Sequence, residues 1–369
     1  MTSKSNQKPD QILTITTFAL IVFGLVMISS AGVAISQYRF NDGYYFFKHQ
    51  LFYGVLPGLF LMYIVQKIDY HFWRRFAFLL FAANLLLLVL VFIPGVGLKF
   101  QGASRWITLG PFSFQPTEML KLTMILYLAA WLESKKDLKR DLFEGFIPFL
   151  AILGIVGFLI IKQPDMGTLG TIVVISVVIF FLSGAKTVHI ASMAGMGILA
   201  FLALVKFESY RMNRLLVFLH PELDPRGIGY QINQALLAIG SGGFFGLGLG
   251  HSRQKFNYLP EPVGDSIFAI ICEEIGLIGA ALLIFLFVTF AMRGLKIAKN
   301  APDMFGKLIA IGITSWIIFQ ALINISAITG LIPLTGVTLP FISYGGTSII
   351  FSMVGVGILL NISKKCGKI

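Results

Sequence analysis

Ten apolar runs, each long enough to cross a lipid bilayer as a helix, dominate this sequence of 369 residues. A spanning helix needs about 20 mostly apolar residues. Apolar residues make up 56% of the chain and charged residues only 12%, whereas a soluble domain carries about 25% charged residues. The runs are residues 11–35, 46–66, 73–93, 116–132, 145–162, 167–184, 187–205, 273–292, 307–330 and 344–362. They predict an all-α polytopic membrane protein with about ten transmembrane helices, forming a single integral membrane domain over 1–369.

The composition excludes several other classes of protein. So few charged residues cannot cover a water-soluble globule, and Cys272 and Cys366 lie too far apart to indicate a disulfide framework or a zinc site. The net charge of +12 has two explanations in a membrane protein, namely orientation in the bilayer and binding of anionic lipid. We therefore expect membrane lipids, and no nucleic acid, among the partners.

The distribution of basic residues predicts the orientation. An even number of spans places both termini on one side, and the loops on that side hold the larger share of the 29 Lys and Arg residues. Many of the other basic residues lie in the segment 206–264, and long loops count little in this comparison. Both termini are therefore expected in the cytoplasm, with 206–264 as a large extracytoplasmic loop between spans seven and eight. Long ordered loops usually carry function.

Two charged residues stand inside the fourth predicted span. Glu118 and Lys121 are three residues apart, so they share a helix face and can pair. A charge at membrane depth costs about 2.5–3.5 kcal/mol on insertion scales and usually faces a protein interior or a wet cavity. The pair either lines a groove that receives a charged headgroup or is a structural ion pair that fixes helix packing.

Further polar residues gather on the predicted outer side, each with two interpretations. Asp165 either contacts a ligand or caps the next helix. Trp106 is either an interfacial anchor or part of a site with Arg105, whose guanidinium suits a phosphate. Arg211 and Arg214 share one face of an amphipathic helix, which either lies on the membrane surface or clamps lipid phosphates.

Asp265 is the most informative acidic residue of the chain. It stands where a helix begins, after Pro and Gly residues, so one interpretation is a helix N-cap. Counting back about 20 residues from Arg293 puts the membrane entry near Glu273. Asp265 then overhangs the outer surface by about 12 Å at 1.5 Å per residue. A lipid headgroup would project into the same region.

The segment 333–348, which joins the last two predicted spans, is too polar and Gly-rich for a simple connection and too short for a domain. Irregular backbone near membrane depth persists only where protein groups or water satisfy its hydrogen bonds. We therefore expect a rigid re-entrant or groove-lining turn here, with Ser343 among the residues that contact a ligand.

Together these motifs resemble the SEDS family, the FtsW/RodA group of bacterial cell-wall polymerases. The residues that carry the resemblance are Gln115-Pro116-Thr117-Glu118 with Lys121, Gln163-Pro164-Asp165, Asn213-Arg214-Leu215, Gly229-Tyr230-Gln231, Leu259-Pro260-Glu261 to Asp265, Glu273-Glu274-Ile275-Gly276, and Leu339-Pro340-Phe341-Ile342-Ser343-Tyr344-Gly345-Gly346. The resemblance implies ten spans in the bacterial cytoplasmic membrane with both termini in the cytoplasm. An FtsW-like division protein is favoured over a RodA-like elongation protein.

The same resemblance implies a peptidoglycan glycosyltransferase that joins lipid II units outside the membrane and releases undecaprenyl pyrophosphate. The family's essential outer-loop aspartate falls on Asp265, its span-four acid and base on Glu118 and Lys121, and its Arg-Trp pair on Arg105 and Trp106. The implied partners are lipid II, a class B penicillin-binding protein acting as transpeptidase, and other membrane proteins of the divisome or elongasome.

Growing a glycan requires an acceptor hydroxyl to attack an anomeric carbon that bears a pyrophosphate-lipid leaving group. Asp265 can serve as general base, by analogy with inverting glycosidases. A helix N-terminus stabilises its anion and makes it a poorer base, which burial or the nearby Glu261 would have to offset. Asp265 could instead bind a divalent cation, Mg²⁺ or Mn²⁺, because hard cations take oxygen ligands. The expected phosphate partners are Arg105, Lys121, Arg211 and Arg214.

Two other functions fit part of the pattern. A lipid II flippase, or another transporter of lipid-linked precursors, would also have charged residues facing a groove, but it needs polar residues along the whole path to the cytoplasm. Here the groups capable of chemistry gather on the outer side, and the last two runs are apolar at their inner halves. A scaffold that only binds a transpeptidase is the third interpretation.

Overall fold

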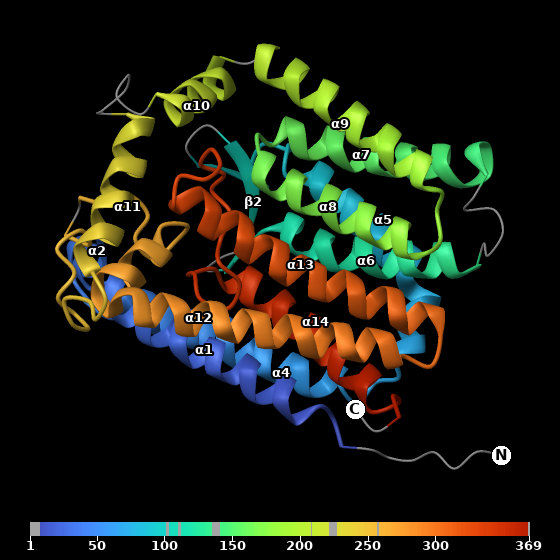
Figure 1. The fold of residues 1–369 in the computed structure, drawn as a ribbon, viewed down its shortest axis with the longest axis horizontal. Helices are drawn as coiled ribbons and strands as arrows, with labels where there is room; N and C mark the ends of the chain where they lie inside the picture. Colours follow the sequence, from blue (N-terminus) through green and yellow to red (C-terminus); the bar gives the residue numbers. More distant parts are fainter. Residues whose placement is uncertain are drawn as a thin grey trace.

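The computed structural model describes residues 8–100, 103–109, 112–134, 141–207, 209–220, 227–256 and 258–367. Helices make up most of it, and most of the long ones lie side by side in roughly one direction (Figure 1). They are α1 (Gln11–Ala31), α2 (Val33–Phe40), α3 (Tyr45–Gln50), η1 (Leu51–Val55), α4 (Leu56–Val65), α5 (Tyr70–Leu90), α6 (Pro116–Ser134), η3 (Leu142–Phe146), α7 (Ile147–Lys162), α8 (Met166–Leu182), α9 (Thr187–Phe207), α10 (Ser209–Leu219), α11 (Ile228–Gly242), α12 (Ile267–Asn300), α13 (Met304–Ile328) and α14 (Gly346–Ser363).

Within these described ranges, seven helices are long and apolar enough to cross a membrane, and α8 is a shorter apolar helix. The seven are α1, α5, η3 with α7, α9, α12, α13 and α14. Two more predicted runs fall on the helical stretch from α3 to α4 and on α6. The π-helical turn η1 interrupts the first of these, and Glu118, Lys121 and Glu133 make α6 less apolar. The polytopic helical fold is therefore confirmed, while the count of ten spans stays a prediction.

Both ends of the described chain lie at the same end of the bundle (Figure 1). The backbone N–H of Asp10, the residue that caps α1, donates to the Ser363 hydroxyl at the end of α14 over 3.0 Å. The buried Asp10 carboxylate also accepts a hydrogen bond from Arg293 Nε of α12 over 3.0 Å. This agrees with an even number of spans; that this end faces the cytoplasm stays a prediction.

The structure adds a small sheet to the expected all-α fold. Strands β1 (Gly97–Phe100), β2 (Ala103–Leu109) and β3 (Phe112–Phe114) pair antiparallel in the order β1-β2-β3. These strands are too short to stand out when a sequence is searched for runs of about 20 apolar residues. Part of the predicted loop 206–264 is also helical, because it contains α10, where an amphipathic helix was expected, and α11.

The helix α12 bends sharply at Gly276, which has φ 70° and ψ −163°. A Cβ atom there would lie 2.4 Å from Gly246 N and 2.6 Å from Phe244 O. Two backbone hydrogen bonds complete the contact: Leu277 N donates to Gly243 O, and Gly248 N donates to Glu274 O. The glycine-rich loop after α11 therefore packs backbone to backbone against the bend, just beyond the start of α12.

Replacing Gly276 by Ala will destabilise the protein, because φ and ψ here lie in a region that essentially only glycine adopts, at a cost of about 1–3 kcal/mol, and because the new methyl group meets backbone atoms. Thermal unfolding in detergent will show a lower Tm. The control is Gly154→Ala in α7, where a Cβ meets nothing within 4 Å. An unchanged Tm for Gly276→Ala would contradict this account of the bend.

Candidate functional site

Residues 334–339 lie between α13 and α14 and have no regular secondary structure. They are named the re-entrant segment. The Thr338 carbonyl accepts a hydrogen bond from Gln320 Nε2. Gln320 lies eight residues before the end of α13. At 1.5 Å per residue, the segment therefore folds back about 12 Å along α13. The segment turns back along α13, and its depth in the membrane stays a prediction.

Side chains from several elements bind the backbone of the re-entrant segment. Arg214 Nη1 of α10 donates to Leu334 O over 3.1 Å. Asn324 Nδ2 and Gln320 Nε2 of α13 donate to Val337 O over 2.7 Å and to Thr338 O over 3.0 Å. Ser343 Oγ accepts a hydrogen bond from Leu339 N over 2.8 Å. Such partners are required where irregular backbone runs among membrane helices.

Asp265 lies beside this segment, directly before α12. Ser266 occupies the N-cap position, so the N-cap interpretation of Asp265 is not the one observed. The Asp265 carboxylate is partly buried, with Oδ1 at 3.5 Å from Gln231 Nε2 of α11. A Cβ on Gly336 would lie 4.0 Å from its Oδ2 atom. The carboxylate therefore stands between α11 and the re-entrant segment.

Burial, together with the smaller effect of the negative charge of Glu261, raises the pKa of the Asp265 carboxyl from 3.8 to about 6. Hydrogen bonds from Gln231 and Ser266 act in the opposite direction but are outweighed. Glu261 itself is exposed, on the turn that precedes Asp265. A carboxylate with a pKa near 6 is mostly ionised at neutral pH and is a stronger base than an ordinary aspartate, as general-base catalysis requires.

The ion pair expected from the spacing of Glu118 and Lys121 is present. Lys121 Nζ lies 2.8 Å from Glu118 Oε1 and 2.8 Å from Gln320 Oε1, and both charged side chains are buried. Trp316 Nε1 donates to the same Gln320 oxygen over 2.8 Å. Glu118 Oε2 has no hydrogen-bond partner among the described residues. The pair is thus built into the bundle while one carboxylate oxygen stays available to a donor.

Arg105 and Asp165 bind backbone groups of the chain itself. Arg105 Nε of β2 donates to Gln163 O over 3.0 Å, and its Nη2 donates to Pro164 O. Asp165 caps α8, because its Oδ1 accepts from Thr168 N over 3.2 Å. The start of α8 also touches the re-entrant segment, since a Cβ on Gly167 would lie 2.8 Å from Thr335 O. The predicted ligand contacts of Arg105 and Asp165 stay predictions.

The other predicted residues lie around the same region. Ser343 Oγ donates to Gly264 O over 2.7 Å, which ties the turn before α14 to the residue before Asp265. Trp106 is partly buried in β2. Arg211 lies on α10, one turn before Arg214, but its side chain is outside the described part of the chain. The structure thus gathers Asp265, Ser343 and Arg214 at the re-entrant segment, and joins Glu118 and Lys121 to it through Gln320.

A second buried polar cluster supports the loop before Asp265. Lys255 Nζ lies 2.9 Å from Glu274 Oε1 and donates to Gly250 O over 2.7 Å. Ser30 Oγ of α1 donates to Glu274 Oε2 over 2.6 Å, and Glu273 Oε1 accepts from Arg253 N over 2.9 Å. The sequence alone does not predict that Glu273 and Glu274 bind residues of α1 and of the loop before Asp265, because these contacts join distant parts of the chain.

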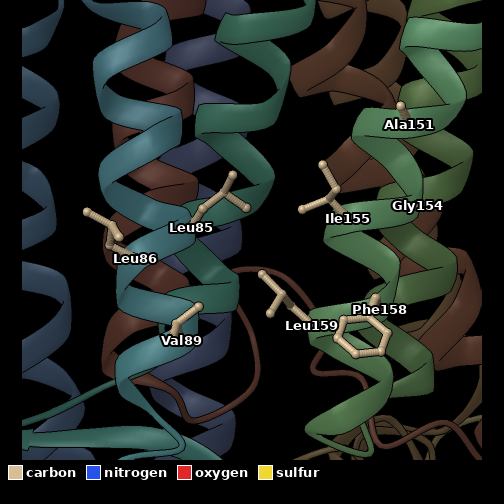
Figure 2. A pocket seen from close by; sticks show the side chains of 8 residues that line it. All are labelled: Leu85, Leu86, Val89, Ala151, Gly154, Ile155, Phe158 and Leu159. Carbon is tan, nitrogen blue, oxygen red and sulfur yellow. The ribbon is translucent and has the colours of Figure 1, made fainter.

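A cavity of about 650 Å³ lies between α5 and α7 and is lined only by apolar side chains. Figure 2 shows them projecting from the two helices. They are Leu85, Leu86, Val89, Ala151, Gly154, Ile155, Phe158 and Leu159. The cavity holds no group that could act as base, nucleophile or phosphate partner.

Comparison with known proteins identifies the family. A family model described as "Cell cycle protein", covering FtsW, RodA and SpoVE, matches residues 10–367. The chain belongs to the FtsW/RodA/SpoVE family. Stage V sporulation protein E of Bacillus subtilis (strain 168) is 45% identical over 365 residues, 99% of each chain. A probable peptidoglycan glycosyltransferase FtsW of Trichlorobacter lovleyi is 43% identical over 355 residues, 96% of this chain and 93% of that protein.

Solved structures of other family members have the same fold. A structure described as "Structural coordination of polymerization and crosslinking by a peptidoglycan synthase complex" matches with a TM-score of 0.80 and 27% identity, covering 97% of this chain and 98% of that one. The crystal structure of rod shape determining protein RodA from Thermus thermophilus matches with a TM-score of 0.72 and 26% identity, covering 98% of each chain. The SEDS resemblance is thereby confirmed, and the relatives named FtsW support the FtsW-like interpretation.

In this family member, Lys121→Met will be strongly destabilising, by about 3–5 kcal/mol, because it leaves the buried Glu118 carboxylate without its cation. The double variant Lys121→Met with Glu118→Gln will recover most of the loss, since no charge is then unpaired. Thermal unfolding in detergent measures both.

The control is Lys48→Met, which breaks the exposed pair with Asp42 and will change Tm little. If the single Lys121 variant were as stable as the double variant, the buried ion pair would not contribute as described.

Proposed function

We propose that this chain is a peptidoglycan glycosyltransferase that polymerises lipid II into glycan strands on the outer face of the bacterial cytoplasmic membrane, and that it releases undecaprenyl pyrophosphate. The observation that carries the proposal is the partly buried Asp265 carboxylate, with a pKa of about 6, beside the re-entrant segment. Relatives named peptidoglycan glycosyltransferase FtsW, which match this chain over nearly its whole length, support the assignment.

In the proposed reaction Asp265 acts as general base. It removes the proton from the acceptor sugar hydroxyl as that oxygen forms a bond to the anomeric carbon of the donor. The bond from this carbon to the pyrophosphate oxygen breaks, and the electron pair leaves with the lipid pyrophosphate. Arg211 and Arg214 of α10 are the proposed cations for the leaving group, together with Lys121. Glu118 Oε2, which lacks a partner among the described side chains, is free to accept a hydrogen bond from the substrate.

The alternative role of Asp265 is to bind a divalent cation, Mg²⁺ or Mn²⁺. The described residues include no group of three or more His, Cys, Asp or Glu side chains placed to hold a metal ion. Asp265 with Glu261, two carboxylates on one turn, fits a hard cation only if substrate pyrophosphate and water supply the other oxygens. Such an ion would neutralise charge on the leaving group.

The alternative function, a lipid II flippase or another transporter of lipid-linked precursors, needs no base. The position of Asp265 beside the hydrogen-bonded re-entrant segment favours the enzyme. Formation of glycan by purified protein from lipid II in detergent discriminates the two functions, because no flipping is needed there.

The proposed partner is a class B penicillin-binding protein acting as transpeptidase, with other membrane proteins of the divisome or elongasome. A solved structure that matches this chain comes from a complex described as coordinating polymerization and crosslinking, which supports this partner. Relatives include FtsW proteins and a sporulation protein, and a matching solved structure is a rod shape determining protein RodA. The proposed role is therefore in cell division or elongation. Location in the inner membrane with both termini in the cytoplasm is part of the proposal.

Asp265→Asn will lower the rate of lipid II polymerisation by about 100-fold or more, the range expected when a general base is lost. The assay measures glycan formed by the purified protein with its transpeptidase partner. The control is Asp42→Asn, which changes a carboxylate in the loop after α2 that pairs only with Lys48 and the Tyr44 N–H among described groups. Wild-type rates for Asp265→Asn would refute the proposed role of Asp265.

The same substitution will stabilise the protein at neutral and alkaline pH. Because the pKa of Asp265 rises from 3.8 to about 6 on folding, ionising it costs stability between these values, and above pH 6 the cost is complete at about 3 kcal/mol. Asp265→Asn will therefore raise Tm at pH 8, and the gain will shrink as the pH falls from 6 towards 4.

Asp42→Asn again serves as the comparison, because hydrogen bonds from Lys48 and the Tyr44 N–H lower the pKa of Asp42. This variant will show no gain in Tm at pH 8. A lower Tm for Asp265→Asn at pH 8 would mean that Asp265 is a stabilising structural carboxylate.

A further inference from the structure

A line of three large polar side chains runs along one face of the otherwise apolar helix α13. Trp316, Gln320 and Asn324 follow one another at intervals of four residues, so they lie above each other on the same face. Trp316 is fully buried, and Gln320 and Asn324 are each 1% exposed. Burying an amide is costly unless its hydrogen-bonding groups are satisfied. Their partners therefore indicate why these residues are placed there.

The side-chain amide of Gln320 has contacts on both sides. Its Oε1 atom accepts from Lys121 Nζ and from Trp316 Nε1, each over 2.8 Å. Its Nε2 atom donates to Thr338 O over 3.0 Å. Because an ammonium and an indole N–H can only donate, the oxygen must face Lys121 and the nitrogen must face Thr338. Gln320 thus connects the Glu118–Lys121 pair to the re-entrant segment in one fixed orientation.

Asn324 makes the corresponding connection to Asp265. Its Nδ2 atom donates to Asp265 O over 2.8 Å and to Val337 O over 2.7 Å. Both protons of its amide are therefore used, and its Oδ1 atom has no partner in the described part of the chain. Asn324 holds the backbone of Asp265 against the residue that precedes Thr338.

These contacts form one continuous chain, because Val337 and Thr338 share a peptide bond. We propose that Gln320 and Asn324 are positioning residues, which fix the distance between Asp265 and the Glu118–Lys121 pair through the Val337–Thr338 peptide. Neither amide touches the reacting atoms. The inference rests on the proposed function, since it assumes that one substrate contacts both groups.

The first test replaces one atom of Gln320. Gln320→Glu keeps the oxygen that accepts from Lys121 and Trp316 but replaces the Nε2 atom that faces Thr338 O and Thr338 Oγ1 by an acceptor. It therefore removes the hydrogen bond to the backbone carbonyl of Thr338 and adds a negative charge beside Lys121. A displacement of about 1 Å at a reacting group costs up to about 100-fold in rate. We expect kcat for lipid II polymerisation to fall 10- to 100-fold, with KM changed less than threefold.

The second test is Asn324→Asp, which removes both donors to Asp265 O and Val337 O without changing the size of the side chain. A matched control is Asn361→Asp in α14. Asn361 is also buried and bonds two backbone groups, Gln66 O and Tyr70 N, each over 2.9 Å, but it lies in the last turn of α14, which bonds Asp10 at the start of α1. Both variants will lower Tm, but only Asn324→Asp will lower kcat per folded molecule.

Two further results decide between positioning and simple stabilisation. Because both amides act through the adjacent residues Val337 and Thr338, the double variant Gln320→Glu with Asn324→Asp will lose less than the product of the two single fold-changes. Hydrogen–deuterium exchange will also increase at 334–339 in each single variant, and this measurement needs no activity. Single variants with kcat within twofold of wild type, a fully multiplicative double variant, or unchanged exchange would each overturn the proposal.

The test of the positioning inference can be told apart from the test of the proposed function. If Asp265→Asn retains activity, the role of Asp265 as base fails, and exchange at 334–339 still tests the positioning contacts. If Asp265→Asn is inactive while Gln320→Glu and Asn324→Asp turn over normally, only the positioning inference fails.

Discussion

Backbone without regular secondary structure among packed membrane helices must find hydrogen-bond partners for its own peptide groups. Residues 334–339 find several of them in the side chains of the candidate site: Arg214, Gln320, Asn324 and Ser343. The bonds that satisfy this backbone also bring α10, α13 and the start of α12 to one place. The geometry of the site and the stability of the fold therefore depend on the same contacts, and removing one donor leaves a buried carbonyl unpaired.

Most of the described aspartates differ from Asp265 in what they bind. Five of them cap helices, each accepting a hydrogen bond from a backbone N–H in the first turn: Asp10, Asp69, Asp141, Asp165 and Asp303. Asp265 precedes a helix whose cap is Ser266, and burial raises the pKa of its carboxyl to about 6. A helix terminus alone would lower that pKa, so burial outweighs the helix dipole. Placing the acid one residue before the cap gives it the properties of a base.

The sequence predicts two kinds of feature: long apolar runs, and contacts between residues that are close in the chain. The apolar runs fall on helices because about 20 apolar residues suffice for a span, and Glu118 pairs with Lys121 because their spacing alone brings them together. The resemblance to the SEDS family singles out Asp265 from the sequence alone. The sequence does not reveal the partners of Gln320 and Asn324, nor the backbone carbonyls that Arg105 binds, because these lie in distant segments. The strands β1 to β3 pair with their neighbours in sequence, but they are too short to stand out in a search for runs of about 20 apolar residues.

The two ends of the bundle are held together differently, which explains how an irregular site can be kept in place. At the end with the termini, helices are joined directly: Asp10 pairs with Arg293 and bonds Ser363, and Asn361 bonds the connection between α4 and α5. At the other end, α12 bends and much of the structure consists of loops. Direct contacts between helices therefore do not fix the distances between the groups of the candidate site. Side chains that bond to backbone replace them there. A catalytic group on a loop keeps its place only if the surrounding side chains are themselves fixed, and the buried face of α13 supplies that support.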